Sequence, residues 1–156
     1  MLNFSIPGYA EIHIEHLVLD YNGTLAIDGL PLTEALVRLS ELARSLTIHV
    51  VTADSHGNVR RYIQDQDISL HILAVDDQCQ QKSDFVTQLG ASKTIAIGNG
   101  FNDHLMLREA VIGIAVIQKE GLSCQTLANA DLVFTNIVDA LDCLGNPIRL
   151  VASLRR

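Results

Sequence analysis

Short apolar runs alternate with longer amphipathic stretches along the chain, and this alternation constrains the fold more than any other feature of the sequence. Runs rich in β-branched residues predict strands, and apolar residues that recur every three or four positions predict helices. Strands that alternate with helices are typical of a parallel sheet with helical crossovers. Several of the runs are apolar at consecutive positions, as expected for strands with helices on both faces. The pattern predicts an α/β fold around a mainly parallel sheet.

The individual elements follow from the same periodicities. The predicted strands are His16–Leu19, Ile48–Val51, Ile72–Val75, Thr94–Ile97, Ile112–Val116 and Leu132–Phe134. The predicted helices are Pro31–Ser45, Val59–Gln66, Gln81–Leu89, Asp103–Glu109, Leu122–Ala128, Asn136–Leu144 and Ile148–Leu154. Near the N-terminus, Phe4–Ile14 alternates apolar and polar residues around Pro7-Gly8, which predicts a β-hairpin arm added to the sheet. Because no linker or internal repeat interrupts the pattern, we expect residues 1–156 to form one domain.

Composition excludes several classes of protein. Of 156 residues, 48% are hydrophobic and 19% charged, which rules out a disordered chain. The formal net charge of −7 argues against nucleic-acid binding through a basic surface, and 4% aromatic residues argue against a surface that stacks bases. No apolar run is long enough to span a membrane, and no signal peptide is evident. Three widely spaced cysteines without a C-x-x-C pair favour a reduced, cytoplasmic protein.

The first predicted strand ends in a residue suited to catalysis. Leu17-Val18-Leu19 runs directly into Asp20, and Tyr21-Asn22-Gly23-Thr24 follows as a turn. Ligand sites of open α/β sheets lie just beyond the carboxyl ends of the strands. An Asp at that place, ahead of a Gly that lets the backbone approach a ligand, is suited to act as a nucleophile or a metal ligand.

Later strand ends carry residues of matching chemistry. Thr52 ends the second strand, Lys82 lies near the start of the helix after the third, and Gly98-Asn99-Gly100-Phe101-Asn102-Asp103 follows the fourth. An Asp, a hydroxyl, a Lys and a second acid in this order suit phosphoryl transfer: the Asp attacks phosphorus, while the hydroxyl, the ammonium and a divalent cation spread the charge on the phosphoryl oxygens. A carboxylate such as that of Asp103 would hold Mg²⁺.

In this ordered set the chain resembles the haloacid dehalogenase superfamily of phosphohydrolases, and within it small proteins similar to the phosphorylation domain of P-type ATPases. D-Y-N-G-T resembles the first motif of the family, T-A-D the second, Lys82 the third and G-N-G-F-N-D the fourth. The resemblance implies a three-layer Rossmann-like α/β sandwich and Mg²⁺-dependent chemistry through an aspartyl-phosphate. Each motif alone is common, but the ordered set is fairly specific.

The resemblance also implies roles for individual residues. We predict a catalytic set of Asp20, Asn22, Thr52 and Lys82, with Asp20 as the nucleophile. The predicted phosphate- and substrate-binding residues are Gly23, Thr52, Ala53, Lys82 and Asn102. The predicted Mg²⁺ ligands are Asp20, the backbone carbonyl of Asn22, Asn99 and Asp103.

Two positions depart from the family pattern. Phosphatases of the superfamily usually carry a second Asp where Asn22 stands, which protonates the leaving group and later activates water. An amide can do neither, so a contribution of about 10²–10⁴-fold from general acid–base catalysis is missing or comes from elsewhere. Asn99 stands where the fourth motif often has its first Asp, and an amide oxygen binds Mg²⁺ with less charge. These departures predict slow turnover.

The spacing of the motifs predicts an open site. The segments from Thr24 to Thr52 and from Thr52 to Lys82 each accommodate one helix and one strand, which leaves no room for the cap domains that many relatives insert there. We therefore expect either a large phosphorylated substrate or a second subunit to cover the site, and we predict a homo-oligomer. The partner is a phosphorylated small molecule or macromolecule, with no nucleic acid and no membrane.

Each predicted role has a structural alternative. Lys82 could be a solvated surface lysine, with Lys93 as a competing candidate, and Thr52 or Asp103 could simply cap a turn or helix. His104, beside Asp103, is a candidate for the missing acid or base, whereas His13 and His16 form only a loose pair on a strand.

At the level of function, two alternatives stand beside the hydrolase. One is a non-catalytic or regulatory protein that binds phosphate or metal, favoured by Asn22 and Asn99. The other is a phosphoacceptor domain of the response-regulator kind. Those domains carry an acidic pair after the first strand, whereas Asp20 here stands alone before Tyr21.

Overall fold

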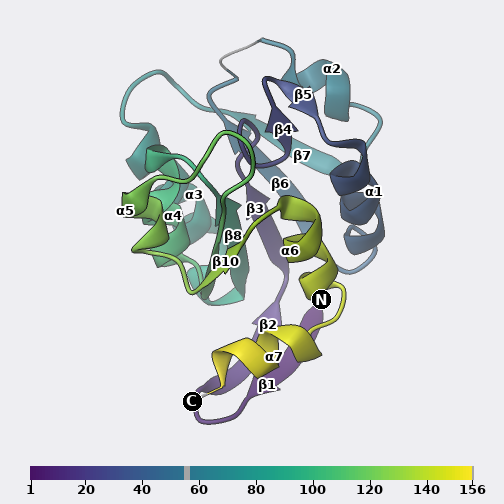
Figure 1. The fold of residues 1–156 in the computed structure, drawn as a ribbon, viewed down its shortest axis with the longest axis vertical. Coiled ribbons are helices and arrows are strands. Elements are labelled where there is room, and N and C mark those ends of the chain that lie inside the picture. Colours follow the sequence, from purple (N-terminus) through teal and green to yellow (C-terminus); the bar gives the residue numbers. More distant parts are fainter. Residues whose placement is uncertain (55–56, 156) are drawn as a thin grey trace.

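The computed structural model describes residues 1–54 and 57–155, which fold around one six-stranded sheet (Figure 1). Its strands, in spatial order, are β10 (Leu132–Phe134), β9 (Ile112–Val116), β8 (Thr94–Gly98), β3 (His16–Leu19), β6 (Thr47–Thr52) and β7 (Ile68–Ile72). All neighbouring pairs are parallel. The predicted mainly parallel α/β sandwich is therefore confirmed.

Helices cover both faces of the sheet, as the strand order requires. The helices are α1 (Thr33–Leu42), α2 (Val59–Ile63), α3 (Gln78–Leu89), α4 (His104–Glu109), α5 (Cys124–Leu127), α6 (Ile137–Leu144) and α7 (Ile148–Leu154). α1 packs beside α6 on one face, and α3 packs beside α4 on the other (Figure 1). The chain leaves β3 toward β6 first and returns later to β8 on its other side, so the direction of winding changes at β3.

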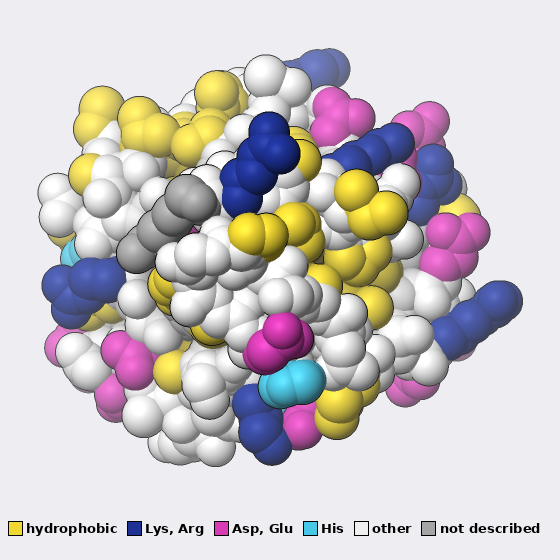
Figure 2. Space-filling view, turned by 90° about the horizontal axis from the view of Figure 1, so that it is seen from below, with side chains coloured by type: hydrophobic (Ala, Val, Ile, Leu, Met, Phe, Trp, Pro, Cys, Tyr) yellow, Lys and Arg dark blue, Asp and Glu magenta, His cyan; other side chains and the backbone are white. Residues whose placement is uncertain are grey.

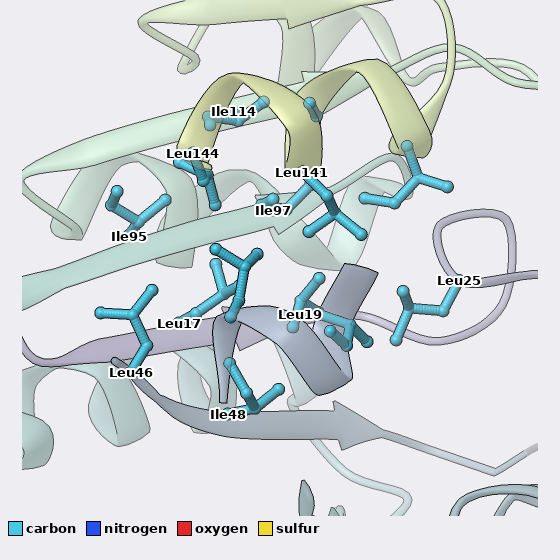
Figure 3. Packing of buried hydrophobic residues seen from close by; sticks show 14 of the residues in the cluster. Leu17, Leu19, Leu25, Leu46, Ile48, Ile95, Ile97, Ile114, Leu141 and Leu144 are labelled. Atoms are coloured by element: carbon cyan, nitrogen blue, oxygen red, sulfur yellow. The ribbon is translucent and has the colours of Figure 1, made fainter. Parts of the chain in front are cut away.

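The larger core lies between the sheet and the α1/α6 layer (Figure 3). Leu17 and Leu19 of β3 face the same side as Ile95 and Ile97 of β8, because alternate residues of a strand share a face. They meet Leu39, one of three buried residues on the predicted apolar face of α1. Burying a side chain of this kind stabilises the folded state by roughly 1.5–3 kcal/mol. This core therefore holds β3 and β8 in register and fixes where their carboxyl ends lie. Those strand ends carry the candidate site.

The third strand is the clearest difference from the sequence prediction. Ile72–Val75 was expected, but β7 runs over Ile68–Ile72 and Val75 is 90% exposed. β7 is an edge strand that pairs only with β6 among the described strands. Its Ile68 and Leu70 pack on the core while Ser69 and His71 face the other side, which is an alternating pattern. The prediction followed the continuous apolar run instead, and that run leaves the sheet after Ile72.

The N-terminal hairpin forms, but it is not part of the central sheet. β1 (Leu2–Ile6) and β2 (Ala10–Ile14) pair antiparallel as a separate two-stranded sheet, and α7 packs against β1. Gly8, with φ of +79°, makes the turn between them. A second small hairpin that the sequence analysis missed, β4 (Ala26–Ile27) with β5 (Leu30–Pro31), follows the Asp20 turn. It takes Pro31 out of the predicted first helix, so α1 begins only at Thr33.

The remaining elements lie close to their predicted positions. α3 begins three residues earlier than expected, at Gln78, because Asp77 caps it by accepting a hydrogen bond from the backbone N–H of Gln80. The 3₁₀ turn Phe101–Asp103 precedes α4 and occupies the start of the predicted helix. Within residues 1–54 and 57–155, the helices are all too short or too polar to cross a bilayer.

Candidate active site

The candidate site lies at the carboxyl edge of the sheet, where the direction of winding changes. Asp20 directly follows β3, and Asn99 directly follows β8, its neighbour on one side. Thr52 is the last residue of β6, the neighbour on the other side. Ligands of open α/β sheets bind in the crevice outside such a switch point. The strand order therefore brings together residues that are up to 80 positions apart in the sequence.

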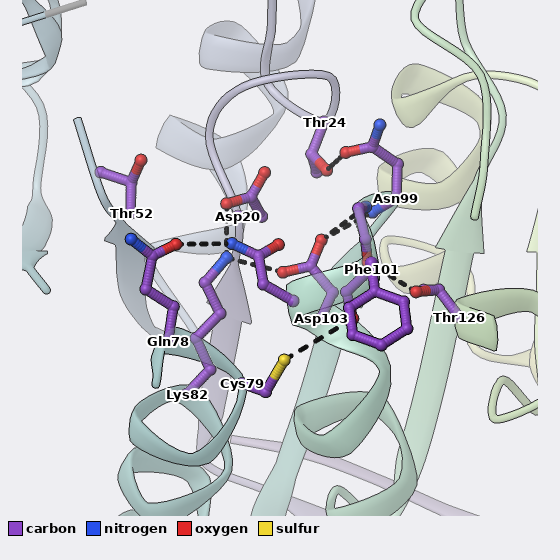
Figure 4. Close-up of polar contacts among 12 residues, drawn as sticks. Asp20, Thr24, Thr52, Gln78, Cys79, Lys82, Asn99, Phe101, Asp103 and Thr126 are labelled. Carbon is purple, nitrogen blue, oxygen red and sulfur yellow. Dashed lines mark hydrogen bonds and ion pairs between the residues drawn. The ribbon is translucent and has the colours of Figure 1, made fainter. Parts of the chain in front are cut away.

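Lys82 joins the two acids of the site. Its Nζ donates to Asp20 Oδ1 and to Asp103 Oδ1, both at 2.6 Å, and Lys82 is fully buried (Figure 4). The two carboxylate oxygens can therefore be no further apart than twice that distance. Burying an ammonium is costly unless charged partners compensate for the lost hydration, and here two carboxylates do so. A solvated surface role for Lys82 is thus wrong.

Burial and the neighbouring charges perturb the ionisation of this trio. Burial and the nearby Asp103 carboxylate raise the pKa of Asp20 to about 7, against the opposing effect of Lys82. Burial disfavours the charged form of Lys82, but the carboxylates of Asp103 and Asp20 outweigh it and hold the Lys82 pKa above its ordinary range. Lys82 and Asp20 therefore form a pair in which the lysine stays positively charged and the carboxyl group titrates near neutral pH.

Asp103 is held by three donors. Its Oδ2 accepts hydrogen bonds from the backbone N–H groups of Asn99 at 2.9 Å and Gly100 at 2.8 Å, while Oδ1 accepts from Lys82. A side chain at position 98 would collide with this carboxylate, since a Cβ on Gly98 would lie 2.5 Å from it. Asp103 thus fastens the loop after β8 to the start of α4 and fixes the position of the Lys82 ammonium.

Asn99 connects the turn after Asp20 to the loop that contains Gly121. Its Oδ1 accepts from Thr24 Oγ1 at 3.2 Å, and its Nδ2 donates to the Gly121 carbonyl at 3.0 Å. Gly23 has a φ of +76°, and a Cβ there would lie 2.3 Å from the Asn99 amide. Gly23 therefore both permits the turn and lets the turn approach Asn99. Gln118 closes the turn from the far side by donating to the Gly23 carbonyl at 3.3 Å.

Asn22 and the residues after β6 complete the edge. Asn22 Oδ1 is buried and accepts no hydrogen bond from any residue that the structure describes. Thr52 is buried, and its Oγ1 accepts a hydrogen bond from the backbone N–H of Asp54 at 3.1 Å. Ala53 is half-buried beside it. Thr52 therefore lies at the carboxyl edge of the sheet and also stabilises its own loop. A role in the site and a role in capping the turn are compatible.

A residue that the sequence analysis missed lies at the rim. Gln78 Oε1 accepts a hydrogen bond from Asn102 Nδ2 at 3.1 Å, and both side chains are half-buried. Gln78 precedes Lys82 by four positions, so the two residues share one face of α3. That spacing was visible in the sequence, but the predicted helix began at Gln81 and so excluded Gln78.

Other candidates lie elsewhere. Lys93 forms an exposed ion pair with Glu15 at 2.9 Å, where β3 begins, which removes it as an alternative to Lys82. His104 Nδ1 bonds the Phe101 carbonyl at 2.6 Å, and its ring packs on that of Phe101. His13 bonds Asn3 rather than His16. The residues described include no group of three or more His, Cys, Asp or Glu side chains arranged as a metal site.

This arrangement suits a reaction in which negative charge develops on oxygen atoms. A carboxyl group that ionises near neutral pH, a buried ammonium beside it and a hydroxyl on the adjacent strand converge on one edge. A carboxylate placed so can act as a nucleophile, and the ammonium can stabilise negative charge that develops next to it.

Solved structures with the same architecture include phosphatases. A 3-deoxy-D-manno-octulosonate 8-phosphate phosphatase from Moraxella catarrhalis, solved with magnesium, phosphate and KDO, superposes with a TM-score of 0.70 at 22% identity, covering 92% of this chain and 88% of that one. The cobalt-bound deoxy-D-mannose-octulosonate 8-phosphate phosphatase of Haemophilus influenzae gives 0.71 at 17%, covering 88% and 90%. A phosphoserine phosphatase from T. onnurineus gives 0.61 at 14%, covering 86% and 96%. The fold is that of the haloacid dehalogenase superfamily.

Sequence comparison adds a nearer relative. An uncharacterized protein of Methanocaldococcus jannaschii is 51% identical over 63 residues, which cover 40% of this chain and 68% of that protein. The chain belongs to the same family as this archaeal protein. No protein-family model matches the chain.

Proposed function

We propose that the protein is a Mg²⁺-dependent phosphohydrolase, a phosphatase or a soluble hydrolase similar to P-type ATPases, that forms an aspartyl-phosphate on Asp20. The observation that carries the proposal is the buried Lys82 ammonium between Asp20 and Asp103. The phosphatases with the same fold support it. We also propose that residues 1–156 form one domain without a cap and that the protein acts in the cytoplasm.

In the first step, an Asp20 carboxylate oxygen attacks phosphorus, the P–O bond to the leaving group breaks, and an acyl-phosphate forms. In this proposal Lys82, which contacts Asp20, and the hydroxyl of Thr52 on the adjacent strand bind the phosphoryl oxygens and stabilise their charge. In the second step, water attacks phosphorus, the bond to Asp20 breaks, and inorganic phosphate leaves. Asp103 keeps Lys82 in position through both steps.

The oxygen atoms of the site residues are of the kind that magnesium binds. Mg²⁺ takes oxygen ligands and needs only one or two carboxylates, with waters and substrate phosphate completing the shell. Asn22 Oδ1 is buried with no described donor, and Asn99 Oδ1 accepts from Thr24 and keeps a second lone pair. We propose that Asp20, Asn22 and Asn99 hold Mg²⁺, with Asn22 Oδ1 as a candidate ligand beside the backbone carbonyl that the resemblance implies. Asp103 contributes least, because three N–H groups already occupy its carboxylate. Bound Mg²⁺ would neutralise charge on the phosphoryl oxygens.

The experiment is turnover of an aryl phosphate by the wild type and by Asp20→Asn, each with and without Mg²⁺. An aryl leaving group needs little protonation, so the missing acid at Asn22 should limit this substrate least. We expect turnover only in the wild type with Mg²⁺. Asp84→Asn serves as the matched Asp-to-Asn control, since Asp84 is exposed on α3 and bonds Gln80 rather than a site residue. Equal activity of wild type and Asp20→Asn would contradict the proposal.

A regulatory protein that binds phosphate or metal without turnover is the alternative. It is favoured by Asn22 and Asn99, two amides that stand where phosphatases of the superfamily carry carboxylates. Absence of turnover together with Mg²⁺-dependent binding of phosphate would favour this alternative.

A further inference from the structure

Gln78 and Asn102 form an uncharged amide pair at the rim of the site. Asn102 Nδ2 donates to Gln78 Oε1 at 3.1 Å, and this is the only hydrogen bond that the structure gives to either side-chain amide among the residues it describes. Asn102 directly precedes Asp103, and Gln78 lies one turn before Lys82. Both members are therefore adjacent to the trio of Asp20, Lys82 and Asp103.

The pair lies on the solvent side of that trio. α3 starts at the carboxyl edge of the sheet, because it follows β7, and it runs back toward the opposite edge. One turn of helix spans about 5.4 Å, so Gln78 lies about that much further out than Lys82. Gln78 and Lys82 both extend from α3 toward Asp20 (Figure 4). Both amides are half-buried and so can be reached from solvent.

The leaving group of the proposed reaction would pass this pair. In-line attack by Asp20 places the leaving group on the far side of phosphorus from the carboxylate. Since Asp20 lies at the strand end, that direction points outward, past Lys82 and toward the rim. The inference rests on the proposed function in this respect.

The chemistry of the pair selects a particular kind of leaving group. Each amide has a donor and an acceptor, and the bond between them uses one of each. One NH₂ group and one carbonyl oxygen of the pair therefore remain available to a ligand. The same is true if the nitrogen and oxygen positions of both amides are exchanged. A hydroxyl both donates and accepts, so neighbouring hydroxyls of a polyol complement this pair. The pair carries no charge with which to select an ionised leaving group.

We propose that Gln78, paired with Asn102, is a specificity-determining residue that binds hydroxyl groups of the leaving group. The substrate class is then the phosphate monoester of a polyhydroxylated, uncharged compound such as a polyol or sugar. In the absence of a cap, this amide pair supplies the selection that a bare phosphate site lacks.

The test compares glycerol 3-phosphate with propyl phosphate, which has the same carbon chain without the hydroxyls. The kcat/KM values for both esters are measured for the wild type, Gln78→Met and Gln78→Ala. Gln80→Ala is the matched control, since Gln80 lies on the same helix, is exposed, and bonds Asp84 instead. A lost hydrogen bond to an uncharged group typically lowers kcat/KM by about fivefold. We expect that loss for glycerol 3-phosphate in both Gln78 variants, no change for propyl phosphate, and no change for either ester in Gln80→Ala.

The outcomes separate the inference from the proposed function. If the wild type hydrolyses both esters and the Gln78 variants change both equally or neither, Gln78 has only a structural role and the inference is overturned. If the wild type hydrolyses neither ester nor an aryl phosphate, the proposed function fails, and the inference fails with it. Met has nearly the length of Gln, so Gln78→Met keeps the packing at this position. If Gln78→Ala fails to fold, the kcat/KM values of Gln78→Met still test the inference.

Discussion

At the scale of single residues, Asn22 limits the proposed reaction more than any other position. Departure of a poor leaving group and hydrolysis of the aspartyl-phosphate both need proton transfer, which an amide cannot provide. Asn22 lies two residues after Asp20 in the same turn and is half-buried, and the family pattern that the chain resembles has its acid–base carboxyl at this position. We expect Asn22→Asp to raise steady-state turnover of an alkyl phosphate by up to about 10²–10⁴-fold.

The wild type should, in contrast, accumulate an acyl-phosphate that can be trapped at low pH. Quantifying labelled phosphoenzyme in wild type, Asn22→Asp and Asp20→Asn checks this directly. No gain in Asn22→Asp, combined with no phosphoenzyme from any donor, would show that Asp20 is not a nucleophile.

The pKa of Asp20 gives a second prediction at this scale. Burial raises it to about 7 in the free protein, so a growing fraction of Asp20 is protonated, and unable to attack, as the pH falls below about 7. We expect kcat/KM for an aryl phosphate to fall about tenfold per pH unit on the acid side of this value at low Mg²⁺. Saturating Mg²⁺ should move the acid limb to lower pH, because a nearby cation favours the carboxylate. A flat profile between pH 5 and 8 would be incompatible with a titrating nucleophile.

Single residues also show what sequence reasoning can and cannot find. Asp20, Lys82 and Asp103 were predicted because charged residues at strand ends carry a clear chemical pattern, and the structure places them in contact. Gln78 and Gln118 were not predicted, because neutral amides are common on surfaces and their partners lie on other elements. Only the fold reveals which amides face the site.

At the scale of elements, three histidines cross the sheet as a hydrogen-bonded series. His16 Nδ1 lies 3.2 Å from His49 Nε2, and His49 Nδ1 lies 3.4 Å from His71 Nε2, on three adjacent strands. Phe85 of α3 packs on the rings of His49 and His71. Each neutral imidazole has one donor and one acceptor, so three neutral rings can form this series.

Burial and the two neighbouring histidines lower the pKa of His49 to about 4. A histidine with a depressed folded-state pKa is neutral when folded, so its contribution to stability is present above about pH 6.5 and is lost as the pH falls toward 4. The raised pKa of Asp20 acts in the opposite direction over the same range, so the histidine is isolated by comparison with a variant that lacks it. From the His49 shift we expect the free energy of unfolding of the wild type to fall, between pH 7.5 and pH 5, by up to about 2 kcal/mol relative to that of His49→Leu. Urea unfolding of wild type and His49→Leu at both pH values measures this difference. The same pH dependence in wild type and His49→Leu would contradict this assignment.

Element positions were predictable where one physical signal dominated. β3 and β9 coincide with their predicted ranges because buried central strands leave little ambiguity, and α7 does so because Pro147 marks its start. The edge strand β10 also coincides with its predicted range. β7 was misplaced because an edge strand that is covered on one face needs alternation rather than a continuous apolar run. The hairpin of β4 and β5 escaped prediction because two-residue strands have no periodicity to detect.

At the scale of the whole molecule, the two ends of the long axis differ in role. The N-terminal hairpin and α7 form one end, and Figure 2 views the molecule from that end. Apolar side chains there lie in several groups among charged side chains of both signs (Figure 2). The opposite end holds the carboxyl edge of the sheet with the candidate site. The hairpin can therefore extend the molecule without obstructing the site.

The site end carries the exposed apolar residues that bear on assembly. Val75 after β7 is 90% exposed, and Phe101 after β8 is 61% exposed. These residues follow strands whose carboxyl ends form the edge with the candidate site, and a second copy of the chain is the simplest cover for them. We expect a closed homo-oligomer, a dimer or a tetramer, in light scattering at tens of micromolar protein. Val75→Asp should shift it toward the 17.0 kDa monomer, because the new charge would be desolvated in the interface. Ile148→Asp is the matched control, since Ile148 is 78% exposed on α7 at the hairpin end. A wild type that is monomeric at this concentration would contradict the prediction and favour a macromolecular substrate as the cover of the site.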